Sequence, residues 1–273
     1  MSRILALAGS EFRIARRNRW VTVSAILMMV FALVLTGAGS APSGALAADR
    51  LSVVVASLTS LAVYLVPLIA LLLSFDAVAG EVERGTLPLL LTYPVTRAEV
   101  LAGKMIAHLA VLSLALLAGY GLAGAVAIWG DRAAMAGLPA LWRLSWSSLL
   151  LGATFLGAGY ALSSLSGRPS GAAGLSIALW VVMVVLYDLA LLAMVVADQG
   201  GALTAQGLPA LLLASPADAF RLFNLAASQA TAAAAGLGAA AKTVPPVLAL
   251  ASLALWPVLA FGAALLAFRN VQP

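Results

Sequence analysis

The sequence contains no cysteine and a single histidine, His108, among its 273 residues. The first absence excludes disulfides, thiolate metal sites and a cysteine nucleophile. The second excludes histidine-rich metal cages and the HExxH motif. The phosphate-binding motif GxxxxGKS/T is also missing, because the nearest fragment, Gly103-Lys104-Met105, lacks both the first glycine and the hydroxyl residue. The chain therefore cannot hydrolyse ATP by the P-loop route, and we expect it to bind no metal or cofactor itself.

Charged residues are scarce as well. They make up 9% of the chain against 63% hydrophobic residues, whereas a soluble domain has about 25% and about 45–50% respectively. A water-soluble fold could not cover so much apolar surface, so the excess must face lipid. The net charge of +5 reflects few acids rather than a basic face. Aromatic residues do not alternate with the basic ones, so we expect no nucleic-acid binding.

Six apolar stretches are long enough to cross a bilayer, which needs about 20 helical residues. They run without the alternation of barrel strands, which predicts an all-α integral membrane protein with one transmembrane domain. The first is the shortest. The predicted transmembrane helices are 20–36, 51–75, 105–129, 144–165, 172–197 and 244–268.

The distribution of lysine and arginine predicts the orientation, because these residues concentrate in cytoplasmic loops. With the N-terminus inside, ten of the fifteen basic residues are cytoplasmic and five are outside: Arg50, Arg132, Arg143, Arg221 and Lys242. Both termini are therefore predicted to be cytoplasmic.

Residues 2–19 have apolar residues at helical spacing and arginines crowded at the end. This pattern is typical of an amphipathic helix on the inner leaflet, with arginines near anionic headgroups. The alternative is an ordinary basic flank of the first transmembrane helix. Ala45-Leu46-Ala47 also gives the outline of a cleavable leader, although the preceding apolar run is long for one.

The longest outer segment, residues 198–243, contains a helix start at Ser215-Pro216-Ala217-Asp218. Serine caps such helices, and proline is favoured at the first helical position. We predict a helix from there to about residue 235. The apolar run 208–214 is too short to span, so partly re-entrant or interfacial helices fit this periplasmic loop.

The cytoplasmic segment 76–104 links the second and third predicted transmembrane helices. The second helix should continue past the membrane, because Glu81, Glu83 and Arg84 belong in water. Gly85 then permits a sharp bend.

A short helix should follow this bend, with Thr86 as its cap and Pro88 tolerated in its first turn. Pro94 should stop it. Thr96 and Glu99 have the spacing of a capping box that begins the third transmembrane helix. The short helix is too apolar to sit free in the cytosol, with Leu87, Leu89, Leu90 and Leu91.

A short apolar helix at a membrane exit suits the groove of a partner protein. Glu81, Glu83, Arg84 and Arg97 flank it and could contact the same partner. The alternative is a loop that packs on its own helical bundle.

Residues 81–104, EVERGTLPLLLTYPVTRAEVLAGK, resemble the coupling segment of ABC-2-type permeases. The resemblance implies six transmembrane helices in the ABC-2, type V exporter-like fold, and a separate cytoplasmic ATPase that binds ATP and Mg. The chain itself would not be an enzyme. Pro88 departs from the family, where many members carry an acid. The implied coupling residues are Glu81, Glu83, Arg84, Gly85, Thr86, Leu87, Leu89, Leu90 and Arg97.

A narrower resemblance rests on LSSLSGRPSGA at 162–172, Trp180, YDLALL at 187–192 and SPADAFRLFNL at 215–225. These stretches are similar to permease subunits that help to mature the copper enzyme nitrous oxide reductase. The resemblance implies a homodimer in a bacterial inner membrane, two ATPase subunits and a periplasmic β-helical partner. Arg168 and Pro169 would form the second cytoplasmic loop. The residues expected to contact the periplasmic partner are Asp218, Phe220, Arg221, Phe223 and Asn224.

Asp188 is the one acid deep within a predicted transmembrane helix, and intramembrane carboxylates usually mark functional sites. It could form a dimer-interface hydrogen bond, relay protons, or make a contact that changes between two states. The alternative is a structural carboxyl bonded to Tyr187 or to a nearby serine. An aspartyl protease needs a second carboxylate, and Asp76 stands at the cytoplasmic end of its own helix.

Methionines such as Met183 and Met194 have helical spacing, which is more typical of packing than of a copper path. The leading hypothesis is therefore a permease that transmits motion from the ATPase to the periplasmic partner. One alternative is an exporter of a small amphipathic or sulfur-containing molecule. Another is a proton-coupled secondary transporter that uses Asp188, against which stands the absence of an inverted repeat.

Overall fold

The computed structural model describes residues 2–16, 19–38, 50–199, 201, 203–225 and 244–271, and this part of the chain contains helices and no strand. The first elements in chain order are α1 (Ser2–Arg16), α2 (Arg19–Ala38), α3 (Arg50–Ser74), α4 (Ala79–Glu83), α5 (Thr86–Leu91), α6 (Arg97–Gly130) and the 3₁₀ helix η1 (Arg132–Gly137). They are followed by α7 (Leu138–Ser166), α8 (Pro169–Trp180), the π-helical η2 (Val181–Leu186), α9 (Tyr187–Asp198), η3 (Leu203–Gly207), α10 (Leu208–Ala214), α11 (Pro216–Leu225) and α14 (Pro246–Arg269).

Five helical stretches of the described chain are long and apolar enough to cross a membrane: Leu51–Glu83, Arg97–Gly130, Arg132–Ser166, Pro169–Asp198 and Pro246–Arg269. They match the last five predicted transmembrane helices, of which the last begins two residues later than predicted, at Pro246. The first predicted one falls in the 20-residue α2, and its crossing of the membrane stays a prediction.

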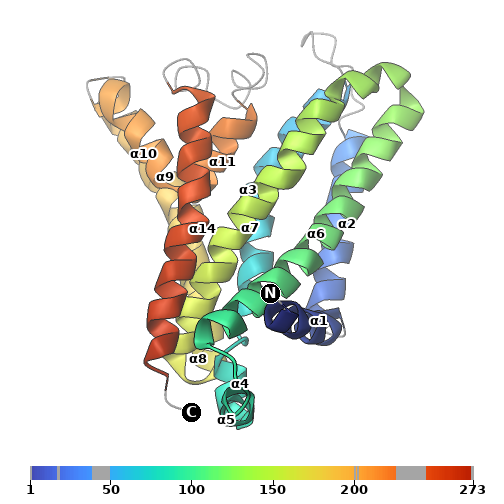
Figure 1. The fold of residues 1–273 in the computed structure, drawn as a ribbon. Coiled ribbons are helices and arrows are strands. Elements are labelled where there is room, and N and C mark those ends of the chain that lie inside the picture. The colour runs from blue at the N-terminus through green and yellow to red at the C-terminus, as the bar shows by residue number, and fades with distance from the viewer. Residues whose placement is uncertain are drawn as a thin grey trace.

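Both ends of the chain lie at the same end of the bundle as α4 and α5 (Figure 1). Helix α1 lies across the axes of the long helices there, as an interfacial helix would. The last residues of α2 and α11 and the first residues of α3 and α14 are at the opposite end. The termini and the segment 76–104 therefore share one side, as the sequence predicted; which side of a membrane this is stays a prediction.

Helix α7 occupies the centre and packs against both α3 and α14, while α6 packs against α1 and α2. The core between these helices contains Leu58, Leu112, Phe155 and Tyr160, all almost completely buried. Lipid is as apolar as these side chains, so close packing rather than the hydrophobic effect holds such helices together.

Of the five long apolar stretches in the described chain, the one from α8 through η2 to α9 is the least covered by other helices, with 11% of its most apolar 18 residues buried. It is unbroken but changes to π-helical geometry at Val181–Leu186. Such π segments are rare and frequently occur at functional sites. Tyr187 and Asp188 follow directly after it.

The outer segment forms the short helices α10 and α11, as expected. The Ser215 hydroxyl accepts a hydrogen bond from the Asp218 amide at 3.2 Å, which confirms the predicted helix start. The predicted extension of this helix to about residue 235 and the possible cleavage site Ala45-Leu46-Ala47 lie outside the described residues.

Candidate functional site

The segment between α3 and α6 is anchored to the bundle where it leaves α3. The Ser163 hydroxyl on α7 accepts hydrogen bonds from the amides of Val78 and Ala79 at 3.0 and 2.9 Å. An ion pair joins Arg84 to Asp76 at 3.3 Å, but both side chains are about half exposed. Such a pair contributes less than about 1 kcal/mol, so the buried serine is the firmer attachment.

Gly85 makes the predicted bend between α4 and α5, with a φ of 64°. This left-handed conformation is unfavourable for residues with a Cβ. The prediction that Thr86 caps α5 is wrong. Gly85 occupies the cap position, Thr86 is the first helical residue, and its hydroxyl donates backward to the Glu81 carbonyl at 3.3 Å. A bend that needs a left-handed residue leaves the cap position to glycine.

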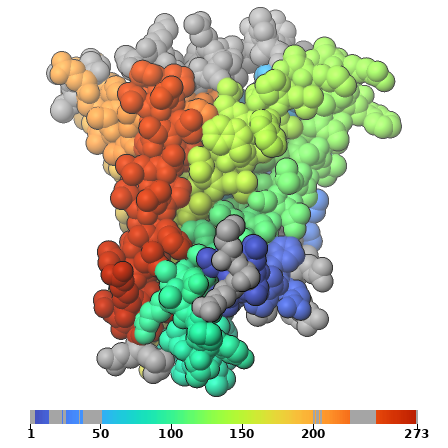
Figure 2. Space-filling model, in the orientation of Figure 1, coloured from blue at the N-terminus to red at the C-terminus, as the bar shows by residue number. Residues whose placement is uncertain are grey.

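Helix α5 divides its apolar side chains between the bundle and the surface. Leu87 is fully buried against the chain's own core. It therefore anchors α5 to the bundle in this arrangement, and its role in coupling to the ATPase stays a prediction. Leu89 and Tyr93 are 65% and 68% exposed, and Glu83 and Arg84 are exposed beside them. The segment projects beyond the other helices at this end of the molecule (Figure 2).

A cavity of about 350 Å³ lies between α1 and the end of α5. Its lining is mostly apolar and comes from both elements: Ala6, Leu7 and Ser10, and Leu90, Tyr93 and Val95. The exposed apolar side chains of Leu89 and Tyr93 thus lie next to a cavity with a mostly apolar lining.

The capping box at the start of α6 is formed as predicted. The Thr96 hydroxyl accepts from the Glu99 amide at 3.2 Å, and the Glu99 carboxylate accepts from the Thr96 amide at 2.7 Å. Arg97, however, is turned away from the surface of α5. Its guanidinium donates to the backbone carbonyls of Phe268, Arg269 and Val271 at the end of α14. Its role as a partner contact stays a prediction.

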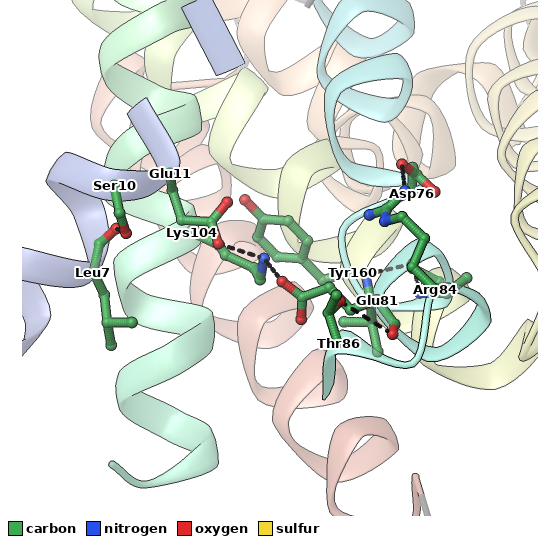
Figure 3. Close-up of polar contacts among 12 residues, drawn as sticks. Leu7, Ser10, Glu11, Asp76, Glu81, Arg84, Thr86, Lys104 and Tyr160 are labelled. Atoms are coloured by element: carbon green, nitrogen blue, oxygen red, sulfur yellow. Dashed lines mark hydrogen bonds and ion pairs between the residues drawn. The ribbon is translucent and has the colours of Figure 1, made fainter. Parts of the chain in front are cut away.

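Lys104 joins three elements in the interior (Figure 3). Its ammonium nitrogen lies 2.7 Å from a Glu11 carboxylate oxygen on α1 and 2.6 Å from a Glu81 carboxylate oxygen on α4. The lysine is 3% exposed. Glu81 was predicted to belong in water; instead its side chain points inward, because Lys104 provides the opposite charge there. Its role in coupling to the ATPase stays a prediction.

One turn further along α6, His108 is buried against α7. Its Nδ1 lies 2.8 Å from the Tyr160 hydroxyl, and the two rings stack with centroids 5.8 Å apart. The histidine thus has a structural partner within the bundle.

The second loop at this end joins α7 to α8. Gly167 ends α7 with a φ of 64°, and Pro169 is the first residue of α8. The Arg168 side chain is exposed, and its carbonyl accepts from the Ser166 hydroxyl at 3.0 Å. Because α8 packs against α4, Arg168 and Pro169 lie at the same end as α5, as predicted.

Asp188 forms an ion pair within the chain. Its carboxylate accepts from the Arg221 guanidinium at 2.9 and 3.1 Å and from the Tyr64 hydroxyl at 3.2 Å. The predicted structural partners, Tyr187 or a serine, are therefore wrong: the Tyr187 hydroxyl donates to the Leu211 carbonyl at 2.8 Å. An ionised carboxylate at membrane depth is tolerated when it is paired, and Arg221 provides the pairing.

Most residues predicted to contact a periplasmic partner are turned into the chain's interior. Asp218, Phe220 and Asn224 are 3%, 0% and 5% exposed. Asn224 bonds to the Ser147 hydroxyl at 2.9 Å. These side chains pack α11 onto α3, α7 and α14, and their contact with a periplasmic partner stays a prediction.

The other two predicted contact residues of α11, Arg221 and Phe223, also have partners within the chain. Arg221 also binds Asp218 at 3.1 Å, and Phe223 packs edge to face with Trp146 at 5.4 Å between ring centroids. Burial raises the pKa of the Asp218 carboxyl above its usual value, although Arg221 opposes that rise.

Comparison with known proteins shows the family of the chain. A family model described as ABC-2 family transporter protein matches residues 5–272. The chain belongs to the ABC-2 transporter family. A protein of Pseudomonas aeruginosa PAO1, named "Probable ABC transporter permease protein NosY", is 43% identical over 266 residues, which are 96% of this chain and 94% of that protein. A protein of Stutzerimonas stutzeri with the same name is 41% identical over 87% of this chain and 86% of its own length.

This ABC-2 permease is a multi-pass protein of the bacterial inner membrane. Within the residues that the structure describes, no three His, Cys, Asp or Glu side chains are grouped so that they could hold a metal ion.

Sequence reasoning missed the Lys104–Glu11–Glu81 cluster of the permease and the His108–Tyr160 pair. The available signal was a lysine followed by a histidine one turn later in an otherwise apolar helix. Buried ionisable side chains almost always have partners, but the partners are 93, 23 and 52 residues away in the sequence.

Proposed function

We propose that this permease binds a separate cytoplasmic ATPase through the exposed face of α5 and transmits its nucleotide-driven movement across the membrane. The observation that carries the proposal is the projecting, partly apolar surface of Leu89 and Tyr93 with Glu83 and Arg84 beside it. An exposed apolar patch rimmed by charges is typical of a protein interface. ATP and Mg would bind in the ATPase, and this chain would not be an enzyme by itself.

The cavity between α1 and α5 supports the same docking mode. Its apolar lining suits an apolar side chain of the ATPase, inserted next to Tyr93. Buried aromatic and apolar anchors of this kind supply most of the affinity of protein interfaces.

The route across the membrane follows α6. This helix is unbroken over 34 residues from the α5 segment to η1 at the outer end, about 50 Å at the usual rise per residue. A rigid helix can carry a displacement over that length if the bundle has two arrangements that nucleotide favours differently.

We further propose that two copies of the permease form a homodimer and act on a periplasmic β-helical partner in the maturation of the copper enzyme nitrous oxide reductase. The similarity to the two NosY permeases supports this proposal. The outer end of α6, η1 and the start of α7 offers the contact surface, with Trp129 and Trp142 94% and 68% exposed. Copper itself would not pass through this chain.

The Asp188–Arg221 ion pair argues against the proton-coupled alternative. A proton carrier must exchange its proton with water, whereas Asp188 is held by two guanidinium nitrogens and a tyrosine hydroxyl. Export of a small amphipathic molecule remains the second candidate, although the site described here favours transmission.

Single-cysteine crosslinking tests the docking proposal, because the chain has no cysteine of its own. A cysteine at Leu89 or Tyr93 should crosslink to the ATPase, whereas one at Trp129, at the opposite end of α6, should not. The combined Glu83→Ala and Arg84→Ala variant should lose ATPase association or lower its turnover. Unchanged assembly and turnover would contradict the proposal.

A further inference from the structure

The cluster around Lys104 connects parts of the chain that lie far apart in the sequence. Glu11 belongs to the transverse helix α1, Glu81 to α4, and Lys104 to the first turns of α6 (Figure 3). Glu81 is four residues before the bend at Gly85, so the cluster holds the base of the projecting segment. A single ammonium group thus links α1 to the element that we propose the ATPase moves.

This link is much less accessible than the other ion pair of the segment. The side chains of Lys104, Glu11 and Glu81 are 4%, 17% and 15% exposed, against 57% and 42% for Arg84 and Asp76. The second Glu81 oxygen is buried without a hydrogen-bond partner among the described residues. Separating such groups would leave charges buried and unpaired, which is strongly unfavourable.

The backbones around the cluster are also in direct contact. A Cβ at Gly103 would lie 2.8 Å from the Leu7 Cβ and 3.4 Å from the Ala8 amide nitrogen. Helix α1 is therefore seated on α6 at a position that only glycine allows. The charge cluster and this close approach are neighbours in the sequence, and both hold α1 against the start of α6.

We propose that Lys104 is a positioning residue that fastens α1, α4 and α5 into one body, so that α1 moves with α5 when the ATPase acts. The inference rests on the proposed function, because it needs a nucleotide-driven movement of α5. The movement of α5 is then delivered to the transverse helix α1 as well as to α3 and α6. Lys104 contacts no nucleotide and acts through Glu81.

Pairs of spin labels in the cysteine-free chain test the inference in the complex with its ATPase, reconstituted in liposomes. Labels at Leu5 and Thr92, both exposed, report the distance between α1 and the end of α5. Labels at Thr92 and Leu165, the exposed end of α7, report the movement of α5 relative to the bundle. Each pair is measured without nucleotide and with trapped ATP.

We expect the Thr92–Leu165 distance to change with nucleotide while the Leu5–Thr92 distance stays constant. If both distances change, α1 and α5 move separately and the inference is overturned, although the proposed function stands. If the Thr92–Leu165 distance does not change, the proposed transmission fails, and this inference fails with it.

Substitution of Lys104 provides the second readout. Lys104→Met should make the Leu5–Thr92 distance broaden or depend on nucleotide, and should lower the turnover number of the complex about tenfold. The KM for ATP should not change, because the nucleotide site is in the partner. Lys104→Arg keeps the charge and should retain part of the turnover. Ser57→Ala, which removes only a bond within α3, should behave as wild type.

Lys104→Met leaves two buried carboxylates unpaired and can fail to fold. The combined variant Glu11→Gln, Lys104→Met and Glu81→Gln avoids this because no charge remains in the cluster. It should assemble with the ATPase and show the same loosened α1 and lowered turnover. Wild-type turnover together with a constant Leu5–Thr92 distance in this variant would overturn the inference.

Discussion

Arg221 binds Asp188 through both of its terminal nitrogens, Nη1 to Oδ1 at 2.9 Å and Nη2 to Oδ2 at 3.1 Å. The pair fastens the outer helix α11 to α9 immediately after the π-helical η2. Bidentate pairs of this kind fix orientation as well as distance. The one acid deep in a membrane-spanning helix is thus part of the attachment of the outer segment.

Replacing Arg221 by leucine should destabilise the permease by about 2–4 kcal/mol. This is slightly less than for a fully buried pair, because the Asp188 side chain is one-third exposed. The combined variant Asp188→Asn and Arg221→Leu should lose less than the sum of the two single variants. Thermal unfolding in detergent, analysed as a double-mutant cycle, measures the difference. Additive losses would mean that the two side chains are not coupled.

Gly85→Ala should strain the bend before α5, because its φ of 64° disfavours a Cβ by about 1–2 kcal/mol. We expect a displaced α5 and weaker ATPase association, measured by co-purification. Gly121→Ala is the matched control. Gly121 is also on the path from α5 outward and, like Gly85, has nothing within 4 Å of an added Cβ. It differs from Gly85 because it lies inside the regular helix α6, where alanine is favoured.

Substitutions at Leu89 and Leu87 should affect different properties: the first the binding of the ATPase, and the second the stability of the permease. Leu89→Asp should abolish co-purification with the ATPase and leave the unfolding temperature unchanged, because this side chain is 65% exposed. Leu87→Ala should instead destabilise the permease by about 2–5 kcal/mol, since Leu87 is fully buried. Equal effects of the two variants on stability would contradict the orientation of α5.

Asp218 should make stability depend on pH. Its pKa is raised above its usual value by burial, so the folded state binds this proton more tightly than the unfolded state. The resulting stabilisation is present below the unfolded pKa and is lost as pH rises through the folded one. Asp218→Asn cannot lose a proton, and its amide oxygen can still accept from Arg221. The stability of wild type relative to this variant should therefore fall as pH rises above about 4, the usual pKa of the unfolded carboxyl, and through the raised pKa of the folded state, measured by unfolding in detergent.

Local sequence signals predicted the helix ends that depend on neighbouring residues alone. The Thr96–Glu99 capping box, the Ser215 start and the bend at Gly85 are such cases, and the structure confirms all three. Thr86 was misassigned because a threonine before an apolar run looks like a cap. Only the left-handed Gly85 shows that the cap position is already occupied.

Contacts between distant segments were not predictable in the same way. Glu81 and Arg97 look like surface residues in a charged loop, and only the fold brings Lys104 and the end of α14 to them. Asp218, Phe220 and Asn224 have an amphipathic pattern that shows one face is buried, but not whether a partner or the chain's own helices cover it. The π-helical η2 has no sequence marker, because its residues are uniformly apolar.

The attachments at Arg97 and Lys104 have a mechanical consequence for the polypeptide as a whole. Arg97 holds the carbonyls at the end of the last helix, and Lys104, about two turns further along α6, holds Glu11 of the first. The first and last helices of the described chain are therefore both fastened to α6: although no covalent bond joins them, neither α1 nor the end of α14 can detach without breaking a polar contact with this one shared helix.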